Sequence, residues 1–268
     1  MDLSLADARR IGGGDINEAY AVTLPDGRRA FVKTRPGALP GEYATEAAGL
    51  RWLDASGAVR VPEVLDADDR HLVLEWLPDG PTDAEELGRA LAALHRSGAP
   101  AFGALPPGAP GPFRIGPLEL GAAPSDDWPS FYAQQRLVPL LPRAGLTTAG
   151  RRAVEAVCER VADLAGPPEP PARLHGDLWS GNVHAGHLID PAAHGGHREV
   201  DLAMLRLFGT PSHPPERFLA AYEEVAPLAP GHEDRVALYQ LLPLLVHAVL
   251  FGGGYAARAE RAARRYAG

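Results

Sequence analysis

One stretch decides how this chain is expected to fold: RLHGDLWSGNV at residues 173–183, followed closely by LIDP at residues 188–191. It contains three polar side chains, Asp177, Asn182 and Asp190, between apolar residues and glycines. Taken singly, each is interpreted as a turn residue, because Gly-Asp, Gly-Asn and Asp-Pro dipeptides commonly initiate turns. Two carboxylates and a carboxamide in this order, on Gly-rich turns between apolar anchors, instead indicate a site for a metal ion and phosphate.

The spacing of these groups suits metal-assisted phosphoryl transfer. Asp177 and Asn182 are separated as the base and a metal ligand are in a kinase catalytic loop of the form H-R-D-x-x-x-x-N. Asp190 follows the apolar pair Leu188-Ile189, as a carboxylate at the end of a short strand would. A small hard cation takes one or two protein oxygens and leaves its other positions to water and phosphate. We therefore expect Asp177 to be the catalytic residue, with Asn182 and Asp190 as ligands of Mg²⁺.

Size and composition limit the classes of protein that this chain can be. Its 268 residues are enough for one large or two modest domains, and at this length about 70–75% of the unfolded surface can be buried. A net charge of −8 argues against a nucleic-acid or anionic-membrane binder, which needs a basic face, but leaves an anionic nucleotide open. The single cysteine, Cys158, excludes an internal disulfide framework and fits a reducing compartment.

The sequence carries no sign of export or membrane insertion. Residues 1–7 show no basic region followed by a long apolar run, so we expect no signal peptide. The most apolar segment, residues 238–251, contains Gln240, Pro243 and His247 and is too short to span a bilayer, so it is interpreted as a buried core helix. We expect a monomeric cytoplasmic protein that binds neither a membrane nor nucleic acid.

Residues 1–77 predict a small lobe built on an antiparallel sheet. Turn residues and strand-like alternation place five strands at residues 8–11, 18–24, 29–34, 59–65 and 71–77. The second and third strands are joined by the hairpin turn Pro25-Asp26-Gly27-Arg28. After a Pro/Gly-rich link, apolar residues at helical spacing predict one helix over residues 42–55. A break at residues 78–82 is suited to a hinge.

Three features of this small lobe are typical of a nucleotide site. The loop at residues 12–17 contains three successive glycines, which let backbone amides approach phosphates closely, although glycines alone also form plain loops. Lys33 lies on the third strand, like the V-A-I-K lysine that bridges nucleotide phosphates. Glu46 on the helix is the natural ion-pair partner of Lys33, with a surface carboxylate as the alternative.

From residue 83 to residue 268 the predicted elements are mainly helices. Thr82 and Glu85 form a capping-box pattern at the start of the first helix. Further helices are predicted over residues 128–141, 147–164, 200–208, 215–225 and 232–266. Residues 97–127 are rich in Pro and Gly, and an irregular segment of this length in a compact domain is usually functional. The short link at residues 184–187 predicts a tight hairpin.

With these elements in order, the chain resembles the protein-kinase-like fold and, within it, the fructosamine kinase (ketosamine 3-kinase) family. The resemblance covers nearly the whole chain and is carried by HGDLWSGN at residues 175–182, IDP at residues 189–191 and GHREVDLAM at residues 196–204. Aminoglycoside and choline kinases share the H-G-D-x-x-x-x-N skeleton but usually lack the Trp-Ser pair and the last run. The loop also resembles the nucleotide loop of this family, which implies nucleotide contacts for Gly13, Gly14, Asp15, Ile16 and Asn17.

The resemblance implies an α+β, two-lobed fold and transfer of phosphate from ATP to the 3-hydroxyl of a ketosamine. The acceptor would be fructosamine or ribulosamine, either free or on a protein lysine. This would be a repair reaction, since the 3-phosphate is labile and its loss frees the amine. Two alternatives stay open: a kinase of the same fold acting on another hydroxylated small molecule, and a catalytically silent nucleotide-binding module. The filled catalytic positions count against the silent module.

Each nucleotide-site residue then has an expected role. Asp177 accepts or orients the proton of the sugar hydroxyl, while Lys33, held by Glu46, steadies the phosphates that do not react. The adenine is expected to meet backbone groups at the hinge around Glu75 and Leu77, because main-chain donors and acceptors match its edge.

The substrate contacts are expected on three residues. Trp179 either stacks on an apolar face of the sugar or packs under the catalytic loop. His197 and Arg198 are expected to contact the substrate, with an ordinary loop salt bridge to Glu199 as the alternative.

Two residues are expected to support the catalytic loop. His175 would brace it through hydrogen bonds. Asp201, at a predicted helix start, is first interpreted as an N-cap, and the resemblance implies that it also ties down the catalytic loop. A zinc site is a weak alternative, because no cysteine joins the five histidines at positions 175, 184, 187, 194 and 197.

Overall fold

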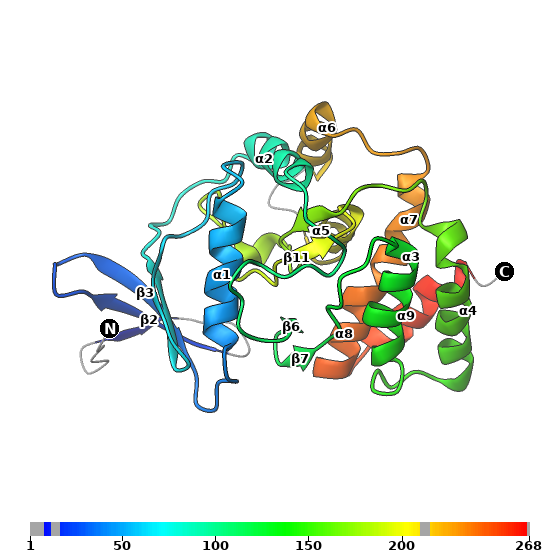
Figure 1. Ribbon diagram of the computed structural model, residues 1–268, viewed down its shortest axis with the longest axis horizontal. Coiled ribbons are helices and arrows are strands. Elements are labelled where there is room, and N and C mark those ends of the chain that lie inside the picture. Colours follow the sequence, from blue (N-terminus) through cyan, green and yellow to red (C-terminus); the bar gives the residue numbers. More distant parts are fainter. Residues whose placement is uncertain (1–7, 12–16, 210–214, 267–268) are drawn as a thin grey trace.

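The computed structural model describes residues 8–11, 17–209 and 215–266 and contains two lobes, a sheet with one helix and a larger helical part (Figure 1). The sheet is antiparallel, with strand order β1-β2-β3-β5-β4. Its strands are β1 (Arg9–Ile11), β2 (Glu18–Thr23), β3 (Arg29–Thr34), β4 (Val64–Ala67) and β5 (His71–Glu75). The predicted α+β fold of two lobes with a five-stranded antiparallel sheet is therefore confirmed.

Helix α1 (Glu42–Asp54) lies between the sheet and the helical lobe (Figure 1). Its apolar residues Tyr43, Ala47 and Leu50 are buried against Leu72 and Leu74 of β5. Burial of this face contributes most of the stability of such a helix, since a short isolated helix is marginal in water.

The fourth strand begins later than predicted. Residues 59–61 lie outside the sheet and contact the helical lobe instead. Arg60 forms an isolated parallel β-bridge with His187, and the carbonyl oxygen of Arg60 accepts a hydrogen bond from Leu188 N at 2.8 Å. The following residue, Pro62, has no N–H to donate to a ladder, so pairing with β5 starts only after it, at Val64.

The helices of the larger lobe lie in the segments where the sequence predicts helices, although one predicted helix is divided into three. They are α2 (Ala84–Arg96), α3 (Trp128–Phe131), α4 (Thr148–Leu164), α5 (Glu199–Phe208), α6 (Pro215–Val225), α7 (His232–Tyr239), α8 (Leu241–Phe251) and α9 (Tyr255–Arg264). Three two-stranded antiparallel sheets lie among them: β6 (Arg114–Ile115) with β7 (Leu118–Glu119), β8 (Ala172–Leu174) with β11 (His194–Gly196), and the hairpin of β9 (Val183–His184) with β10 (His187–Leu188). The tight hairpin predicted at residues 184–187 is thus confirmed.

Three details of the helical prediction are wrong. The single helix predicted over residues 232–266 is broken at Gln240 and again after Phe251, where Gly252 and Gly253 adopt left-handed conformations (φ 66° and 61°) that favour glycine. The helix predicted over residues 128–141 is only one α-turn, continued by a π-helix and a 3₁₀-helix.

The third error concerns the cap of α2. Asp83 caps this helix, since its carboxylate accepts from Glu85 N and Glu86 N at 2.9 Å. The hydroxyl of Thr82, predicted to be the cap, accepts from Gly186 N at 3.0 Å instead, and so joins the start of α2 to the β9–β10 hairpin.

One helical stretch in the described chain, His232–Phe251, is long and apolar enough to cross a membrane by length and composition alone. In the structure, 61% of its apolar window is buried inside the helical lobe. Leu238, Leu241 and Leu245 on it are fully buried in the largest apolar cluster of the lobe. A buried core helix can meet the same criterion of length and composition, and the sequence analysis expects such a helix here.

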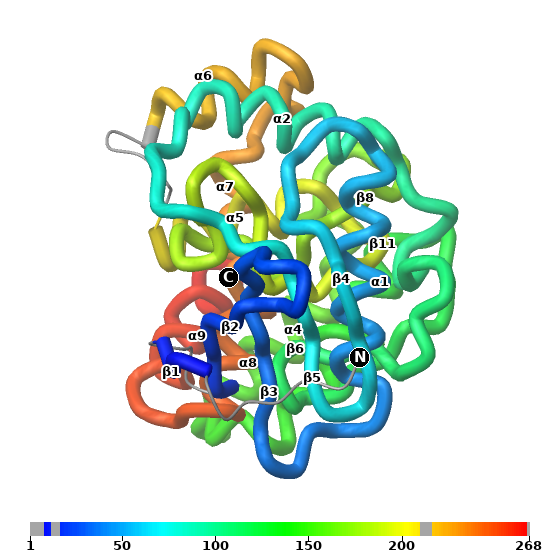
Figure 2. Tube along the Cα trace, turned by 90° about the vertical axis from the view of Figure 1, so that its left-hand side faces the viewer, coloured from blue at the N-terminus to red at the C-terminus, as the bar shows by residue number. Residues whose placement is uncertain are grey.

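Helices α2 and α6 lie side by side at the upper edge of the molecule in both orientations (Figures 1 and 2). Their close approach depends on Gly88, because a Cβ atom at this position would lie only 2.4 Å from the carbonyl oxygen of Phe218.

We expect Gly88→Ala to lower the free energy of unfolding by about 1–3 kcal/mol, because the cost of forcing the helices apart exceeds the gain in helix propensity. Urea denaturation measures this difference. Arg51→Ala, at an exposed position of α1, serves as the control and should change stability by less than about 0.5 kcal/mol. A Gly88→Ala protein as stable as the parent would show that α6 can move away at no cost.

Candidate active site

The catalytic loop is anchored by a fully buried carboxylate on α5. Asp201 accepts hydrogen bonds from the backbone amides of His175 (2.8 Å) and Gly176 (2.9 Å), and His95 of α2 lies 3.2 Å from the same carboxylate. Gly176 itself has φ 84°, and a Cβ there would lie 2.0 Å from the carbonyl oxygen of Ala192. Only glycine fits this turn.

This contact corrects one expectation and supports another. Asp201 is not the N-cap of α5, since the helix begins at Glu199 and the carboxylate lies inside its first turn. Its bonds to two amides of the loop are those expected of a residue that ties the loop down. A tertiary contact explains the difference. The backbone amides of His175 and Gly176, which follow β8, lie beside the first turn of α5 and donate to the Asp201 carboxylate.

His175 links the catalytic loop to the segment that carries Asp190. Its Nδ1 accepts from Asp177 N at 3.3 Å, so the proton of the neutral ring lies on Nε2, which donates to Ile189 O at 2.9 Å. Burial lowers the pKa of His175 and keeps the ring neutral. The bracing role expected for His175 thus has a defined set of bonds.

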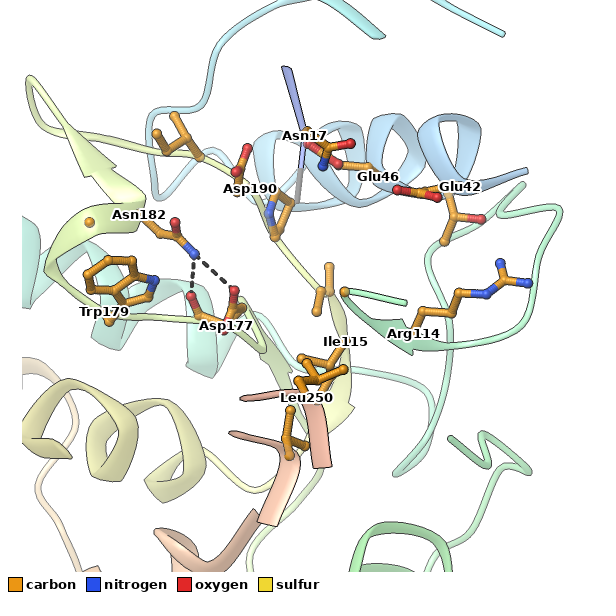
Figure 3. A pocket seen from close by; sticks show the side chains of 18 of the residues that line it. Asn17, Glu42, Glu46, Arg114, Ile115, Asp177, Trp179, Asn182, Asp190 and Leu250 are labelled. Atoms are coloured by element: carbon orange, nitrogen blue, oxygen red, sulfur yellow. Dashed lines mark hydrogen bonds between the residues drawn. The ribbon is translucent and has the colours of Figure 1, made fainter. Parts of the chain in front are cut away.

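Asp177 and Asn182 lie side by side on this loop (Figure 3). The side-chain amide of Asn182 donates to Asp177 O at 2.7 Å and to Asp177 Oδ2 at 3.1 Å, which leaves the Asn182 Oδ1 atom outside these bonds. Burial raises the pKa of Asp177 to about 6, although the hydrogen bond from Asn182 opposes the shift. Asp177 is therefore more basic than an ordinary aspartate and still mostly ionised at neutral pH.

Lys33 joins the two lobes at this site. Its ammonium lies 2.8 Å from Glu46 Oε2 and 3.2 Å from Asp190 Oδ1, so the ion pair expected with Glu46 is present. Burial opposes the charged form, but Asp190 and Glu46 outweigh it and raise the pKa of Lys33. Asp190 adopts a left-handed conformation (φ 53°), which is uncommon outside glycine and often marks a functional constraint.

A cavity of about 920 Å³ lies between the lobes at these residues. The residues expected from the sequence that line it are Asn17, Lys33, Glu46, Asp177, Trp179, Asn182 and Asp190. The structure therefore brings together groups that lie as far as 173 positions apart in the chain. Asn17 is further held by the hydroxyl of Tyr43, which donates to its Oδ1 at 3.1 Å.

Some expected nucleotide contacts are not brought to this cavity. Gly13, Gly14, Asp15 and Ile16 lie outside the described residues. Glu75 and Leu77 do not line the cavity.

The backbone of these two hinge residues already has partners in the structure. Glu75 N donates to Glu63 O at 2.9 Å, and His184 Nε2 lies 3.3 Å from Leu77 O. An adenine contact at these positions stays a prediction.

Trp179 packs on the catalytic loop, as one of its two interpretations requires, and its stacking on a sugar stays a prediction. The ring packs over Gly181, where a Cβ atom would lie 2.3 Å from the ring, and 39% of the side chain is exposed at the cavity. It supports the catalytic loop and leaves aromatic surface for a ligand.

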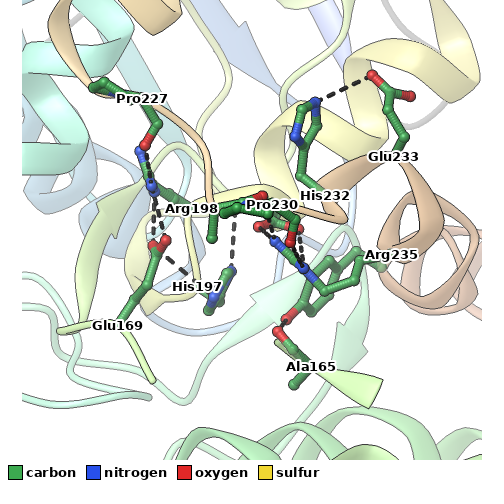
Figure 4. Close-up of polar contacts among 12 residues, drawn as sticks. Ala165, Glu169, His197, Arg198, Pro227, Pro230, His232, Glu233 and Arg235 are labelled. Carbon is green, nitrogen blue, oxygen red and sulfur yellow. Dashed lines mark hydrogen bonds and ion pairs between the residues drawn. The ribbon is translucent and has the colours of Figure 1, made fainter. Parts of the chain in front are cut away.

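Neither His197 nor Arg198 lines the cavity. Both make polar contacts within the helical lobe (Figure 4). Arg198 makes a bidentate ion pair with Glu169 at 2.6 and 2.7 Å, and His197 is buried with its ring stacked on Tyr239 at 5.0 Å. The alternative salt bridge to Glu199 is also wrong, since Glu199 pairs with Arg235. The partner of Arg198 is a partly buried carboxylate far away in the sequence, which no local pattern predicts. We therefore correct the expected substrate contacts of His197 and Arg198 to structural ones.

Glu169, His197 and Glu199 could also hold a metal ion, since one ligand atom of each lies within 4.8 Å of the others. Each carboxylate, however, has a guanidinium partner, Arg198 for Glu169 and Arg235 for Glu199, at 2.6 Å (Figure 4). Because the two arginines already balance the two carboxylates, a divalent ion would bring uncompensated charge into the core. We do not assign a metal to this cluster.

The residues at the cavity fit a magnesium ion better. Asn182 Oδ1 and the carboxylate of Asp190 are hard oxygen donors at the same end of the cavity, and two such ligands leave room for water and phosphate (Figure 3).

Sequence reasoning missed the residues that complete the cavity. Phe113, Arg114 and Ile115 come from the Pro/Gly-rich segment, and the ends of α8 and α9 supply others. The only sequence signal for the first group was the length of the irregular segment at residues 97–127. The residues from α8 and α9 belong to an apolar sequence pattern that is typical of a buried core helix.

Comparison with known proteins decides the family. The family model described as fructosamine kinase matches residues 2–267. The chain belongs to the fructosamine kinase family. The resemblance inferred from the motifs is thereby confirmed.

Individual members of this family match over nearly the whole chain. A Thermus thermophilus protein assigned as a ketoamine kinase is 40% identical over 91% of this chain and 87% of its own length. A crystal structure assigned as a fructosamine-3-kinase from Thermobifida fusca is 46% identical, covers 96% of this chain and 92% of that chain, and has a TM-score of 0.88. A type I macrolide 2'-phosphotransferase, 20% identical over 95% of this chain and 89% of that chain, shares the fold alone with a TM-score of 0.63.

We expect Asp177→Asn to raise the free energy of unfolding at pH 7 by about 1–3 kcal/mol, because burial disfavours the ionised carboxylate in the folded state. Because the folded pKa of Asp177 lies above the unfolded one, the contribution of this carboxyl to stability is fully present below about pH 4 and is lost as pH rises through about 6. The gain in the variant should therefore vanish below pH 4. Urea denaturation from pH 3.5 to 8 tests this.

Asp79→Asn is the matched control, since the Asp79 side chain is fully exposed. It should leave stability unchanged across the same pH range. A neutral or destabilising effect of Asp177→Asn at pH 7 would contradict the assignment of a desolvated carboxylate.

Proposed function

We propose that this ATP-dependent phosphotransferase transfers the γ-phosphoryl group of ATP to the 3-hydroxyl of a ketosamine. The observation that carries the proposal is the meeting of Lys33, Asp177, Asn182 and Asp190 in one cavity of a fructosamine kinase family member. The reaction would begin repair of glycated amines, as the resemblance implied.

Asp177 is the base in this proposal. Its carboxylate accepts the proton of the attacking hydroxyl, and its raised pKa of about 6 gives a stronger base than an ordinary aspartate without loss of the ionised form at pH 7. The hydrogen bonds from Asn182 hold the carboxylate in place on the loop.

The phosphates are held by residues of both lobes. Lys33, oriented by Glu46, supplies a fixed positive charge for the phosphates that do not react. Asn182 and Asp190 would hold Mg²⁺, which neutralises negative charge on the phosphoryl group when it is bound. The 3.2 Å contact between Lys33 and Asp190 keeps these two groups in one place.

The proposal also covers the range of acceptors, the oligomeric state and the cellular location. We include ketosamines on protein lysines as well as free ones, since the cavity has exposed aromatic residues, Trp179 and Phe251, on its lining. A monomer is the proposed working form, because one chain supplies Lys33, Asp177, Asn182 and Asp190, the full set of groups that the proposed reaction needs. We also propose a cytoplasmic location, because the proposed reaction needs ATP.

Incubation with Mg-ATP and a panel of fructosamine, ribulosamine, an aminoglycoside and choline tests the function directly. We expect ADP release with the ketosamines and phosphate on the 3-hydroxyl, measured by NMR. Turnover of the aminoglycoside or choline alone would assign another kinase of this fold. Absence of turnover with every acceptor would support the silent nucleotide-binding module.

We expect Asp177→Asn to lower kcat by about 10²- to 10⁴-fold, because the hydroxyl loses its proton acceptor. Nucleotide affinity, measured by calorimetry, should remain close to that of the parent, since Lys33 and the metal ligands are unchanged. Near-normal turnover in the variant would reject the role of Asp177.

The pH profile gives an independent check. We expect kcat/KM of the parent to rise with pH and to level off above about 6, because only the ionised Asp177 accepts a proton. A profile that stays flat between pH 5 and 8 would argue that this carboxylate does not act as the base.

A further inference from the structure

Four aromatic rings form one wall of the cavity, called here the aromatic wall: Phe208, His247, Phe251 and Tyr255. The ring of His247 lies at their centre, stacked on Phe208 at 4.4 Å and tilted toward Tyr255 and Phe251 at 5.0 and 5.3 Å. Phe208, His247 and Tyr255 have no part in the binding of phosphate, the metal ion or the proton described above.

The wall is assembled by three helices. Phe208 ends α5, His247 and Phe251 lie one turn apart on α8, and Tyr255 begins α9. The two left-handed glycines after Phe251 reverse the chain, so that Tyr255 returns to the same ring cluster.

This wall lies in the same cavity as the catalytic carboxylate. Leu250 shares the face of α8 with His247 and Phe251, because residues three and four positions apart are neighbours on a helix. Figure 3 shows Leu250 and Ile115 on the side of Asp177 away from Asp190 and Glu46. The aromatic wall therefore lies on the side of Asp177 that faces away from the expected phosphate and metal site. An acceptor hydroxyl that reacts at Asp177 would bring the rest of the acceptor to this side.

Exposure supports a ligand contact here. Among the described residues, three large apolar side chains are exposed, and two of them, Trp179 and Phe251 at 39% and 49%, line this cavity. Exposed aromatic surface inside a cavity is costly unless something covers it.

His247 adds one polar group of defined character. Its Nδ1 lies 2.8 Å from Pro243 O, and since a carbonyl can only accept, the ring proton lies on Nδ1. Burial lowers the pKa of His247, which keeps the ring neutral, so Nε2 carries a lone pair. The aromatic wall thus presents π faces and a hydrogen-bond acceptor.

We propose that the aromatic wall binds the protonated amine of the acceptor and so lets the enzyme select ketosamines over the parent ketoses. The proposal rests on the proposed function. A ketosamine differs from its ketose in the ammonium group that replaces the hydroxyl on C1, and its nitrogen lies three bonds from C3. A cation with attached CH₂ groups is attracted to aromatic faces, and its N–H can donate to His247 Nε2. The amine substituent would lie along Leu250 and Ile115.

A pair of matched acceptors tests this selection: 1-propylamino-1-deoxyfructose, which is cationic, and 1-O-propylfructose, which is neutral and of similar shape. We expect the parent to prefer the amine in kcat/KM by on the order of tenfold. Phe208→Leu and Tyr255→Leu should each bring this ratio toward one, because leucine keeps apolar volume but has no π face. The KM for ATP should stay unchanged in both variants.

Leu250→Ala is the matched control, since Leu250 lines the same part of the cavity without a ring. This variant should lower kcat/KM for both acceptors by the same factor, so that the ratio of the two values stays that of the parent. The proposal would be overturned if the parent enzyme showed no preference for the amine in kcat/KM. It would also be overturned if the two leucine variants kept the preference of the parent. A parent that phosphorylates neither acceptor would reject the proposed function itself.

A measurement on the parent alone avoids any folding defect of the variants. Propylammonium should inhibit competitively against the ketosamine and not against ATP, and it should do so on the order of tenfold better than propanol. Equal inhibition by the two compounds, or competition of propylammonium with ATP, would overturn the proposal.

Discussion

The active site depends on the buried carboxylate of Asp201. It satisfies two backbone amides at the start of the catalytic loop, those of His175 and Gly176, and it is itself contacted by His95. Without the carboxylate these amides would be left unpaired in the core, at a cost of about 1–3 kcal/mol each. The position of Asp177 therefore follows from a contact between β8, α2 and α5. The chemistry at the cavity is arranged by the helical core beneath it.

The cavity combines two kinds of surface that serve different parts of one reaction. Charged and hydrogen-bonded groups from both lobes, centred on Lys33 and Asp190, suit phosphates and a divalent ion. The other side is formed by apolar and aromatic side chains from the segment around Phe113 and from α8 and α9. A polar end for the phosphates and an apolar end for the acceptor would separate the chemistry from the choice of acceptor.

Much of the fold could be predicted because its signals are local. The hairpin turn at residues 25–28, the alternation of the strands and the helical spacing of α1 each arise from neighbours in the chain. Errors occurred where a tertiary contact competes with local preference. Residues 59–61 leave the sheet for the β9–β10 hairpin, and Thr82 bonds Gly186 instead of capping α2.

By itself, the sequence determined the chemical groups of the site and their order: a lysine on a strand, a glutamate on a helix, and Asp177, Asn182 and Asp190 on turns. Their spacing is encoded over a few residues, so it can be read without coordinates. Only the tertiary structure decided that His197 and Arg198 are core residues and that the aromatic wall faces the cavity. The physical reason is that burial and ion pairing depend on which distant segments meet, and the same apolar helix can face a core or a ligand.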